Sequence, residues 1–322
     1  MQKNRTLIFC GLSHLSINYG VSAAKLNQKI IFFYTKKKIN DFHNNKIKFE
    51  EPKLYSYLKK YKKNIIFTSM LPKNISNSIY FLAIDIVTSS KNISNYKSIN
   101  EMINFLCLNI KIKKNPLVLM SQVKPKFTRK INWPKKLLFY QVETLIFGDA
   151  INRAENPERI IVGTHNGLKV NDRSYAIYLN LFKVPIINMN YEEAELCKMF
   201  INSYLVSNVI LTNNLASICK KLNLNWEKPK QALMLDKRIG KFAYLKPGLG
   251  ISGGNLERDI VNLNKLNKEL KINTSLFSIF LNESQRQKKW LSNIINKSIN
   301  DKIIKKTSKI GIIGISYKEK TN

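Results

Sequence analysis

The chain has 322 residues, which is enough for one large hydrophobic core or two smaller ones, and we expect two domains. Apolar residues make up 44% and aromatic residues 10%, a composition that excludes a largely disordered chain. The formal net charge of +33 suggests a nucleic-acid partner at first sight. However, lysines are spread through nearly every segment and arginine is rare, so the pattern favours a solvated surface over a nucleic-acid-binding face.

Cysteine and histidine usage indicates a reducing compartment without a structural metal. The cysteines form no CxxC pair and the histidines share no metal-ligand spacing; they are Cys10, Cys107, Cys197, Cys219, His14, His43 and His165. We therefore expect a cytoplasmic protein.

Neither a signal peptide nor a membrane span is expected. The apolar stretch from Leu7 to Leu15 follows basic residues, but Gly11, Ser13 and His14 interrupt it. No other run approaches the apolar length of a membrane span, so no membrane partner is expected.

The first fifty residues show a strand, a turn, a helix and a second strand. Thr6–Cys10 is a short apolar strand, Gly11 starts a turn, 19–27 has helical character, and 29–34 is again apolar. Further apolar runs repeat this rhythm at residues 64–67, 78–84, 116–120 and 159–163. Strands that alternate with helical stretches predict an α/β fold, with a parallel sheet and helices on both faces.

From residue 190 the pattern changes to long helices. Asn190 and Glu193 are spaced as a capping box, and no Gly or Pro interrupts 191–222. Pro229, Pro247 and several glycines mark a loop-rich stretch, and 259–270 and 283–305 are expected to be helical.

The last segment, KIGIIGISY at 309–317, again has the pattern of a strand that leads into a glycine turn. Its similarity to LIFCGLSHL at residues 7–15 predicts that a second domain of the same type begins there, so we expect the chain to be the N-terminal part of a longer protein. The expected boundaries are 1–189 for a Rossmann-type domain, 190–282 for a central helical domain, 283–308 for a connecting helix and 309–322 for the start of another domain.

One face of the long helix carries the best functional signal in the residues alone. Five positions follow helical spacing and share this face: Lys198, Asn202, Leu205, Val209 and Asn213. A lysine and an asparagine one turn apart direct two hydrogen-bond donors to the same point. A solvent-facing lysine on a lysine-rich protein is the competing interpretation.

Nine motifs occur in the order typical of the UDP-glucose/GDP-mannose dehydrogenase family, which the chain resembles. They are GLSHLS, EPKLYSYL, SQVKPKFTRK, YQVETLIFGDA, NPERIIVGT, EAELCKMFINSYL, DKRIG, KPGLGISGGNLERDIVNL and GIIGISYKEKT. The resemblance implies an N-terminal NAD domain, a central helical segment that forms a homodimer, and a C-terminal domain for the nucleotide-sugar. It also implies oxidation of a primary alcohol of a UDP- or GDP-sugar in two hydride transfers, a reaction of polysaccharide biosynthesis.

The resemblance also implies roles for particular residues. Lys198 matches the lysine that stabilises negative charge on the sugar oxygen, with Asn202 beside it; Asp259 matches an aspartate of proton transfer, and Glu143 a glutamate near the reacting carbon. The cofactor would contact Gly11, Ser13, His14, Leu15, Tyr34, Ser121 and Gln122. The sugar-nucleotide would contact Arg238, Tyr244 and a loop that contains Gly248, Gly250, Gly253 and Gly254.

Four departures from the family pattern bear on the chemistry. Asn255 occupies the place of the catalytic cysteine, so the covalent route is unavailable. Ser13 and Ser16 replace two glycines of the dinucleotide fingerprint, and Tyr34 replaces the acid that binds the ribose. Finally, Gln122 replaces a threonine and Phe147 a glutamate.

These observations predict a nucleotide-sugar dehydrogenase-like oxidoreductase that uses NAD, with NADP as an open alternative because Lys36, Lys37 and Lys38 follow Tyr34. A homologue that binds nucleotide or sugar-nucleotide without catalysis, or a decayed gene fragment, is the alternative function.

Overall fold

The computed structural model describes residues 5–73, 75–89, 94–251, 254–311 and 313. The chain divides into two compact units. The first contains residues 5–87 and 94–198, and the second contains most of the described residues from 199 onward.

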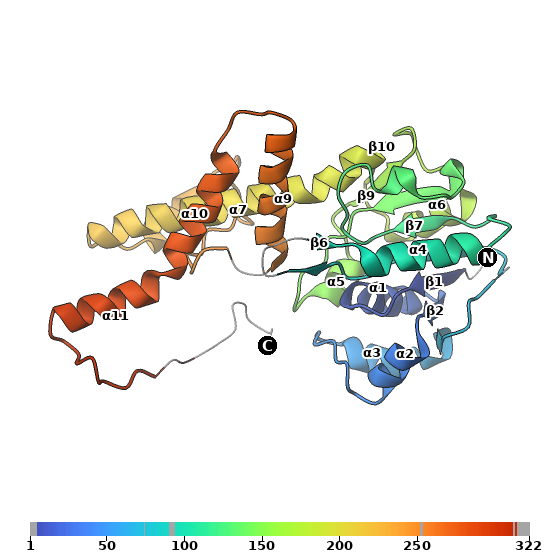
Figure 1. Cartoon of the computed structure of the whole chain (residues 1–322), viewed down its shortest axis with the longest axis horizontal. Coiled ribbons are helices and arrows are strands. Elements are labelled where there is room, and N and C mark those ends of the chain that lie inside the picture. Colours follow the sequence, from blue (N-terminus) through green and yellow to red (C-terminus); the bar gives the residue numbers. More distant parts are fainter. Residues whose placement is uncertain (1–4, 74, 90–93, 252–253, 312, 314–322) are drawn as a thin grey trace. The chain divides into compact units, whose positions relative to one another are not determined.

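The first unit is built on one eight-stranded sheet with the order β10-β9-β8-β7-β4-β1-β2-β3 (Figure 1). Its strands are β1 (Thr6–Cys10), β2 (Lys29–Phe33), β3 (Ile65–Thr68), β4 (Ser78–Leu82), β7 (Leu117–Leu119), β8 (Leu138–Gln141), β9 (Ile160–Thr164) and β10 (Ile186–Asn190). The short strands β5 (Val87–Thr88) and β6 (Ser94–Asn95) lie outside this sheet. The sequence pattern predicted six of the eight strands and missed β8 and β10.

The sheet is parallel except at one pair. In the parallel part, Ile8 of β1 lies beside Ile31 of β2 and Tyr80 of β4. β9 runs antiparallel to β8, with Tyr140 opposite Gly163, and β10 is parallel to β9. The predicted parallel sheet is therefore confirmed except at the β8–β9 pair, which the sequence could not reveal because an apolar run carries no information on strand direction.

Short helices connect the strands: α1 (His14–Lys25), α2 (Lys36–His43), α3 (Leu54–Lys60), α4 (Lys97–Asn109), α5 (Ala150–Glu155) and α6 (Arg173–Leu179). α1 begins at His14 and not near Tyr19 as expected, because Ser13 and Ser16 form a capping box at its start. α1 packs on α3 and α5, and α6 packs on β4. The core includes Phe9, whose ring packs on Phe32 at a centroid distance of 5.7 Å and on Phe81 at 5.0 Å.

The central strand order defines a Rossmann-type, doubly wound sheet. From β1 the chain first adds β2 and β3 on one side of the sheet and then adds β4 on the other side, so the strand order changes sides between β1 and β4. Sheets of this type bind ligands in the crevice at the carboxyl ends of the two strands where the order changes sides. Gly11 follows β1, and Ala83, Ile84 and Asp85 follow β4.

Gly11 is required by the close approach of these two strand ends. Its φ is +129°, and a Cβ atom there would lie 2.5 Å from the carbonyl oxygen of Ala83 and 2.8 Å from the Ile84 side chain. We expect Gly11→Ala to lower the free energy of unfolding by about 3 kcal/mol, because backbone strain and a backbone clash add.

Gly167→Ala is the matched control in the same unit. Gly167 also has a positive φ, +74°, but its Cβ would meet only the Asn190 side chain at 3.3 Å. We expect a loss of about 1 kcal/mol from strain alone. Equal losses in urea unfolding for the two variants would contradict the clash at Gly11.

The second unit is helical. α7 (Tyr191–Lys221) begins in the first unit and matches the expected long helix; α8 (Glu227–Leu235), α9 (Gly254–Glu269), α10 (Leu276–Lys288) and α11 (Trp290–Asn300) follow. Its core contains Val206, Ile210, Ile251 and Ile260, with Phe277 and Phe280 packed against them.

Three expectations for this unit are corrected. The single connecting helix expected at 283–305 is in fact two helices, α10 and α11 (Figure 1). Lys289 is both the C-cap of α10 and the N-cap of α11, and neither Gly nor Pro marks the break in the sequence. Pro229 lies in the first turn of α8, where its missing N–H costs nothing. α9 begins at Gly254 and not at Asp259.

The expected strand at 309–317 lies largely outside the described residues. Residues 309–311 and 313, which are described, are in no strand. The domain expected to begin at 309 therefore stays a prediction.

Candidate active site

Lys198 of α7 forms an ion pair with Glu143 in the first unit. Lys198 Nζ lies 3.1 Å from Glu143 Oε1, and the two side chains are only 12% and 16% exposed. Glu143 stands two residues after β8, and its Oε2 accepts a hydrogen bond of 3.1 Å from the backbone N–H of Leu145. The two residues expected to be catalytic are thus neighbours at the carboxyl end of a sheet strand.

Asn202 and Asp259 form a buried pair in the second unit. Asn202 Nδ2 donates to Asp259 Oδ2 at 2.5 Å, and Asp259 Oδ1 lies 3.4 Å from Nε of Arg258. Asp259 is completely buried, and Asn202 and Arg258 are each 5% exposed. A buried carboxylate with two such partners is held in one position.

Asn255, at the place expected for a nucleophile, is exposed in the first turn of α9. Its amide can donate and accept hydrogen bonds but cannot attack carbon at neutral pH.

The start of α1 binds its own side chains. Ser13 Oγ accepts a hydrogen bond from the N–H of Ser16 at 3.1 Å and donates to the carbonyl of Ala83 at 2.9 Å, while Ser16 Oγ accepts from the N–H of Ser13 at 2.8 Å. The N–H of His14 donates to Asp85 Oδ2 at 3.3 Å. Leu15, also expected at the cofactor, is buried in the core. The backbone N–H groups of Ser13, His14 and Ser16, at the helix start where such folds bind phosphate, therefore already have partners.

The His14 ring is fixed by two neighbours. Its Nε2 lies 2.8 Å from Glu51 Oε1, and its centroid is 4.3 Å from that of Phe147. The buried Glu51 carboxylate also accepts from the N–H groups of Gly148, at 2.8 Å, and Ala150, at 3.1 Å. Phe147, which replaces an expected glutamate, thus packs on the first residue of α1.

The remaining candidate cofactor residues follow β2 and β7. Tyr34 comes directly after β2 and is half-buried, and burial raises the pKa of its hydroxyl. Ser121 is buried, and its Oγ accepts a hydrogen bond of 2.8 Å from the N–H of Ile84, which joins the ends of β4 and β7. Gln122 is partly buried beside it in the sequence.

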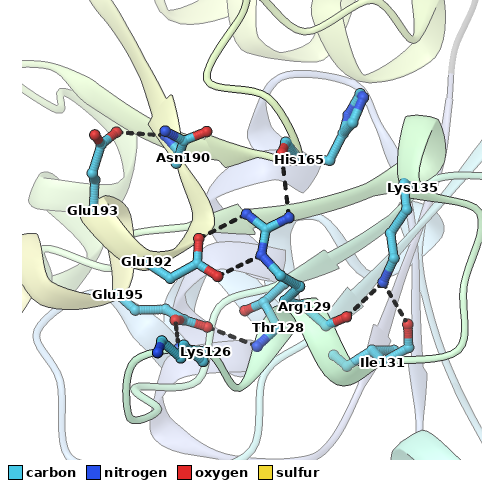
Figure 2. Close-up of polar contacts among 10 residues, drawn as sticks. All are labelled: Lys126, Thr128, Arg129, Ile131, Lys135, His165, Asn190, Glu192, Glu193 and Glu195. Atoms are coloured by element: carbon cyan, nitrogen blue, oxygen red, sulfur yellow. Dashed lines mark hydrogen bonds and ion pairs between the residues drawn. The ribbon is translucent and has the colours of Figure 1, made fainter.

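The loop after β7 is bound to the first turns of α7 by carboxylates, as Figure 2 shows. Glu195 accepts from the backbone N–H of Lys126 at 2.6 Å and of Thr128 at 2.7 Å. Arg129 makes a two-pronged ion pair with Glu192, at 2.5 and 2.8 Å. At the start of the helix, the N–H of Asn190 donates to Glu193 at 2.7 Å, which is one half of the expected capping box.

The candidate sugar-binding residues of the second unit have individual roles. Gly248 donates its N–H to Asn213 Oδ1 at 2.7 Å, and Gly250, with φ of +85°, packs against Ser284. Gly254 begins α9, so it does not belong to the loop, and Gly253 lies outside the described residues. Arg238 pairs with Asp236 at 2.6 Å, and Tyr244 is 41% exposed.

The described part of the chain shows neither a metal-binding cluster nor a membrane-spanning helix. No cluster of three or more His, Cys, Asp or Glu side chains suits a metal ion there. Nor does any described helix combine the length and apolar character that a membrane crossing needs.

The first unit has a Rossmann-type sheet and the second unit is helical, and the comparisons agree. A sequence model of the central domain of the UDP-glucose/GDP-mannose dehydrogenase family matches residues 192–283. UDP-glucose 6-dehydrogenase of Rickettsia bellii is 24% identical over 93% of this chain and 67% of its own length. The Bacillus subtilis enzyme TuaD is 27% identical over 56% of this chain and 38% of its own length. The chain is thus similar to the UDP-glucose/GDP-mannose dehydrogenase family, in the central domain by the sequence model and over most of its length by the Rickettsia bellii enzyme.

Solved structures share the fold. A UDP-glucose dehydrogenase from Pyrobaculum islandicum has a TM-score of 0.75 at 19% identity, covering 93% of this chain and 71% of that one. A UDP-D-ManNAc dehydrogenase from Pyrococcus horikoshii has a TM-score of 0.76 at 15% identity, covering 93% and 73%. The chain spans 38% and 67% of the two curated relatives named above.

Sequence reasoning missed two acids at the site. Asp85 lies just past a fully buried strand, at the edge where such sheets bind ligands, and that position alone was a usable signal. Glu195 lies inside the EAELCK motif, but nothing in the local pattern shows that its partners are backbone groups about seventy residues earlier.

Proposed function

We propose that the protein oxidises the primary alcohol of a UDP- or GDP-sugar with NAD as hydride acceptor. The Lys198–Glu143 ion pair carries the proposal, because it holds a cation, largely out of water, at the carboxyl end of the sheet where ligands of this fold bind.

The crevice between β1 and β4 suits a dinucleotide in its overall construction. Gly11 permits the close approach of the strand ends, and α1 points its N-terminus at the crevice. Ser13, His14 and Ser121 would lie along the phosphates, and Tyr34 at the ribose end. NAD supplies the hydride acceptor when bound. The chain's own residues would stabilise charge on the substrate oxygen and exchange the proton.

Asp85 opposes this binding. Its carboxylate accepts the His14 N–H, and burial raises its pKa even though part of the side chain stays exposed. A pyrophosphate at the start of α1 would meet this negative charge and would compete for the same donor. We expect Asp85→Asn to tighten NADH binding about tenfold, equivalent to about 1.4 kcal/mol, in a fluorescence titration.

Asp172→Asn is the control for Asp85→Asn, because Asp172 caps α6 and asparagine caps helices equally well. It should leave the NADH dissociation constant unchanged. Unchanged binding in the Asp85 variant would show that the carboxylate does not face the phosphates.

In the reaction, Lys198 would stabilise the negative charge that develops on the substrate oxygen as hydride leaves carbon. Glu143, at 3.1 Å, holds the lysine side chain in place. Asn202 and Asp259 would hold water or substrate hydroxyl groups, and Asp259 would exchange the proton.

Asn255 determines how far the oxidation goes. Without a nucleophile at this position, no covalent sulfur adduct forms to carry the aldehyde through a second hydride transfer. We propose release of an aldehyde after one hydride. Counting reduced cofactor per sugar consumed tests this: one supports aldehyde release, and two supports oxidation of an aldehyde hydrate.

The deciding experiment is a panel of UDP-glucose, UDP-N-acetylmannosamine and GDP-mannose, each with NAD and with NADP, followed by absorbance of the reduced cofactor. We expect turnover with one sugar and with NAD in preference to NADP. Binding of a nucleotide-sugar without turnover would instead favour the non-catalytic homologue.

We also propose a homodimer through α7. Three of its large apolar side chains are exposed in the second unit: Tyr204 at 77%, Leu211 at 58% and Ile218 at 56%. Exposed apolar side chains along one helix are typical of a subunit interface. Light scattering coupled to size exclusion measures the mass directly.

A further inference from the structure

Glu195 is a buried carboxylate whose described partners are two backbone groups of one loop. The residue is completely buried in the second turn of α7. Each of its oxygens accepts one N–H: Oε2 from Lys126 at 2.6 Å and Oε1 from Thr128 at 2.7 Å (Figure 2). Burial raises the pKa of Glu195, and the donors from Thr128 and Lys126 oppose that shift.

The loop that Glu195 binds contains a backbone conformation that the loop does not favour by itself. Lys126 has φ of +69°, the left-handed region that L-residues seldom adopt. The Lys126 N–H in this conformation points to Glu195. The Glu195 carboxylate thus stabilises a left-handed backbone conformation at Lys126 that a lysine does not favour by itself.

Both ends of this connection reach the candidate active site. The loop starts after β7 with Ser121, which bonds to the end of β4 at the dinucleotide crevice. Glu195 itself lies three residues before Lys198 on the same helix. One buried side chain therefore links the cofactor side of the crevice to the lysine that pairs with Glu143.

We propose that Glu195 is a positioning residue that fixes the 121–128 loop against α7, so that Ser121 and Gln122 keep a set distance from Lys198. It touches neither substrate nor cofactor. The inference rests on the proposed function, because the two parts it joins are the proposed cofactor loop and the proposed catalytic lysine.

The test is Glu195→Gln. An amide offers one acceptor oxygen, so one of the two N–H groups would face an NH2 group. Amide hydrogen exchange of Lys126 and Thr128 should accelerate at least about tenfold. NADH binding should weaken about tenfold and kcat should fall by a similar factor, while KM for the sugar stays unchanged.

Two further variants separate positioning from general loss of stability. Glu155→Gln makes the same change away from this loop in the first unit, on a carboxylate that pairs with Lys25 Nζ at 2.8 Å, and should leave exchange at Lys126 and Thr128 unaltered. Lys126→Gly in the Glu195→Gln background removes the left-handed strain and keeps the N–H, so it should restore part of the NADH affinity. A structural defect elsewhere would not respond to this glycine.

Unchanged exchange in Glu195→Gln would overturn the proposal, as would faster exchange with unchanged NADH binding and kcat. If the wild-type protein neither binds dinucleotide nor turns over any sugar of the panel, the proposed function fails. The proposed role of Glu195 in catalysis would then also be wrong. The hydrogen-exchange rates of Lys126 and Thr128 would still show whether Glu195 fixes the loop.

Discussion

Lys198→Met should lower kcat for the proposed oxidation by about two to three powers of ten, the loss seen when one fixed donor to a developing oxyanion is removed. The lysine would act on charge that is present mainly in the transition state, so KM should change less than kcat. Steady-state kinetics with the sugar that the panel identifies measures both constants.

The structure adds a second reason for a large effect. Lys198 Nζ is 3.1 Å from Glu143, and both side chains are mostly removed from solvent. Methionine preserves the length of the side chain but leaves the Glu143 charge without this partner, which also disfavours negative charge on a nearby substrate oxygen.

Lys221→Met is the control, because Lys221 is exposed in the last turn of α7 and lies in the second unit. It should leave kcat and KM unchanged. Lys198→Arg should retain part of the activity, since it keeps the charge but changes the geometry. An unchanged kcat in Lys198→Met would show that the lysine takes no part in the reaction.

Elements with strong local patterns were predictable from the sequence. The strands β1, β2 and β4 are short apolar runs beside turns, and α7 is a stretch of about thirty residues without Gly or Pro. The antiparallel direction of β9 and the helix break at Lys289 could not be predicted from the sequence. Both strand direction and helix breaks without Gly or Pro depend on tertiary packing.

The site shows the same division. Helical spacing and motif order selected Lys198, Asn202 and Asp259, but their partners follow from the fold: Glu143 reaches Lys198 from the end of β8, and Asp259 reaches Asn202 from α9. The fingerprint showed that Ser13 and Ser16 replace two glycines. It could not show that these two residues cap α1 together, because a capping box normally pairs Ser with Glu or Gln.

Asp259→Ala should produce the largest loss of stability among substitutions in the second unit. The change removes the acceptor of the Asn202 amide at 2.5 Å and the negative charge 3.4 Å from the Arg258 Nε, all among residues at most 5% exposed. Breaking a buried ion pair on one side costs about 3–5 kcal/mol. Arg258 keeps further interactions, so we expect a value of about 3 kcal/mol in urea unfolding.

Asp236→Ala is the matched control, because Asp236 pairs with Arg238 in the same unit while the arginine side chain is 89% exposed. Solvent screens that pair, so its loss should change stability little. Asp259→Asn should fall between the two, since an amide oxygen can still accept from Asn202 but no longer offsets the Arg258 charge. If Asp259→Ala and Asp236→Ala unfold at the same urea concentration, the buried pair does not stabilise this unit. Its polar groups would then be retained for chemistry alone.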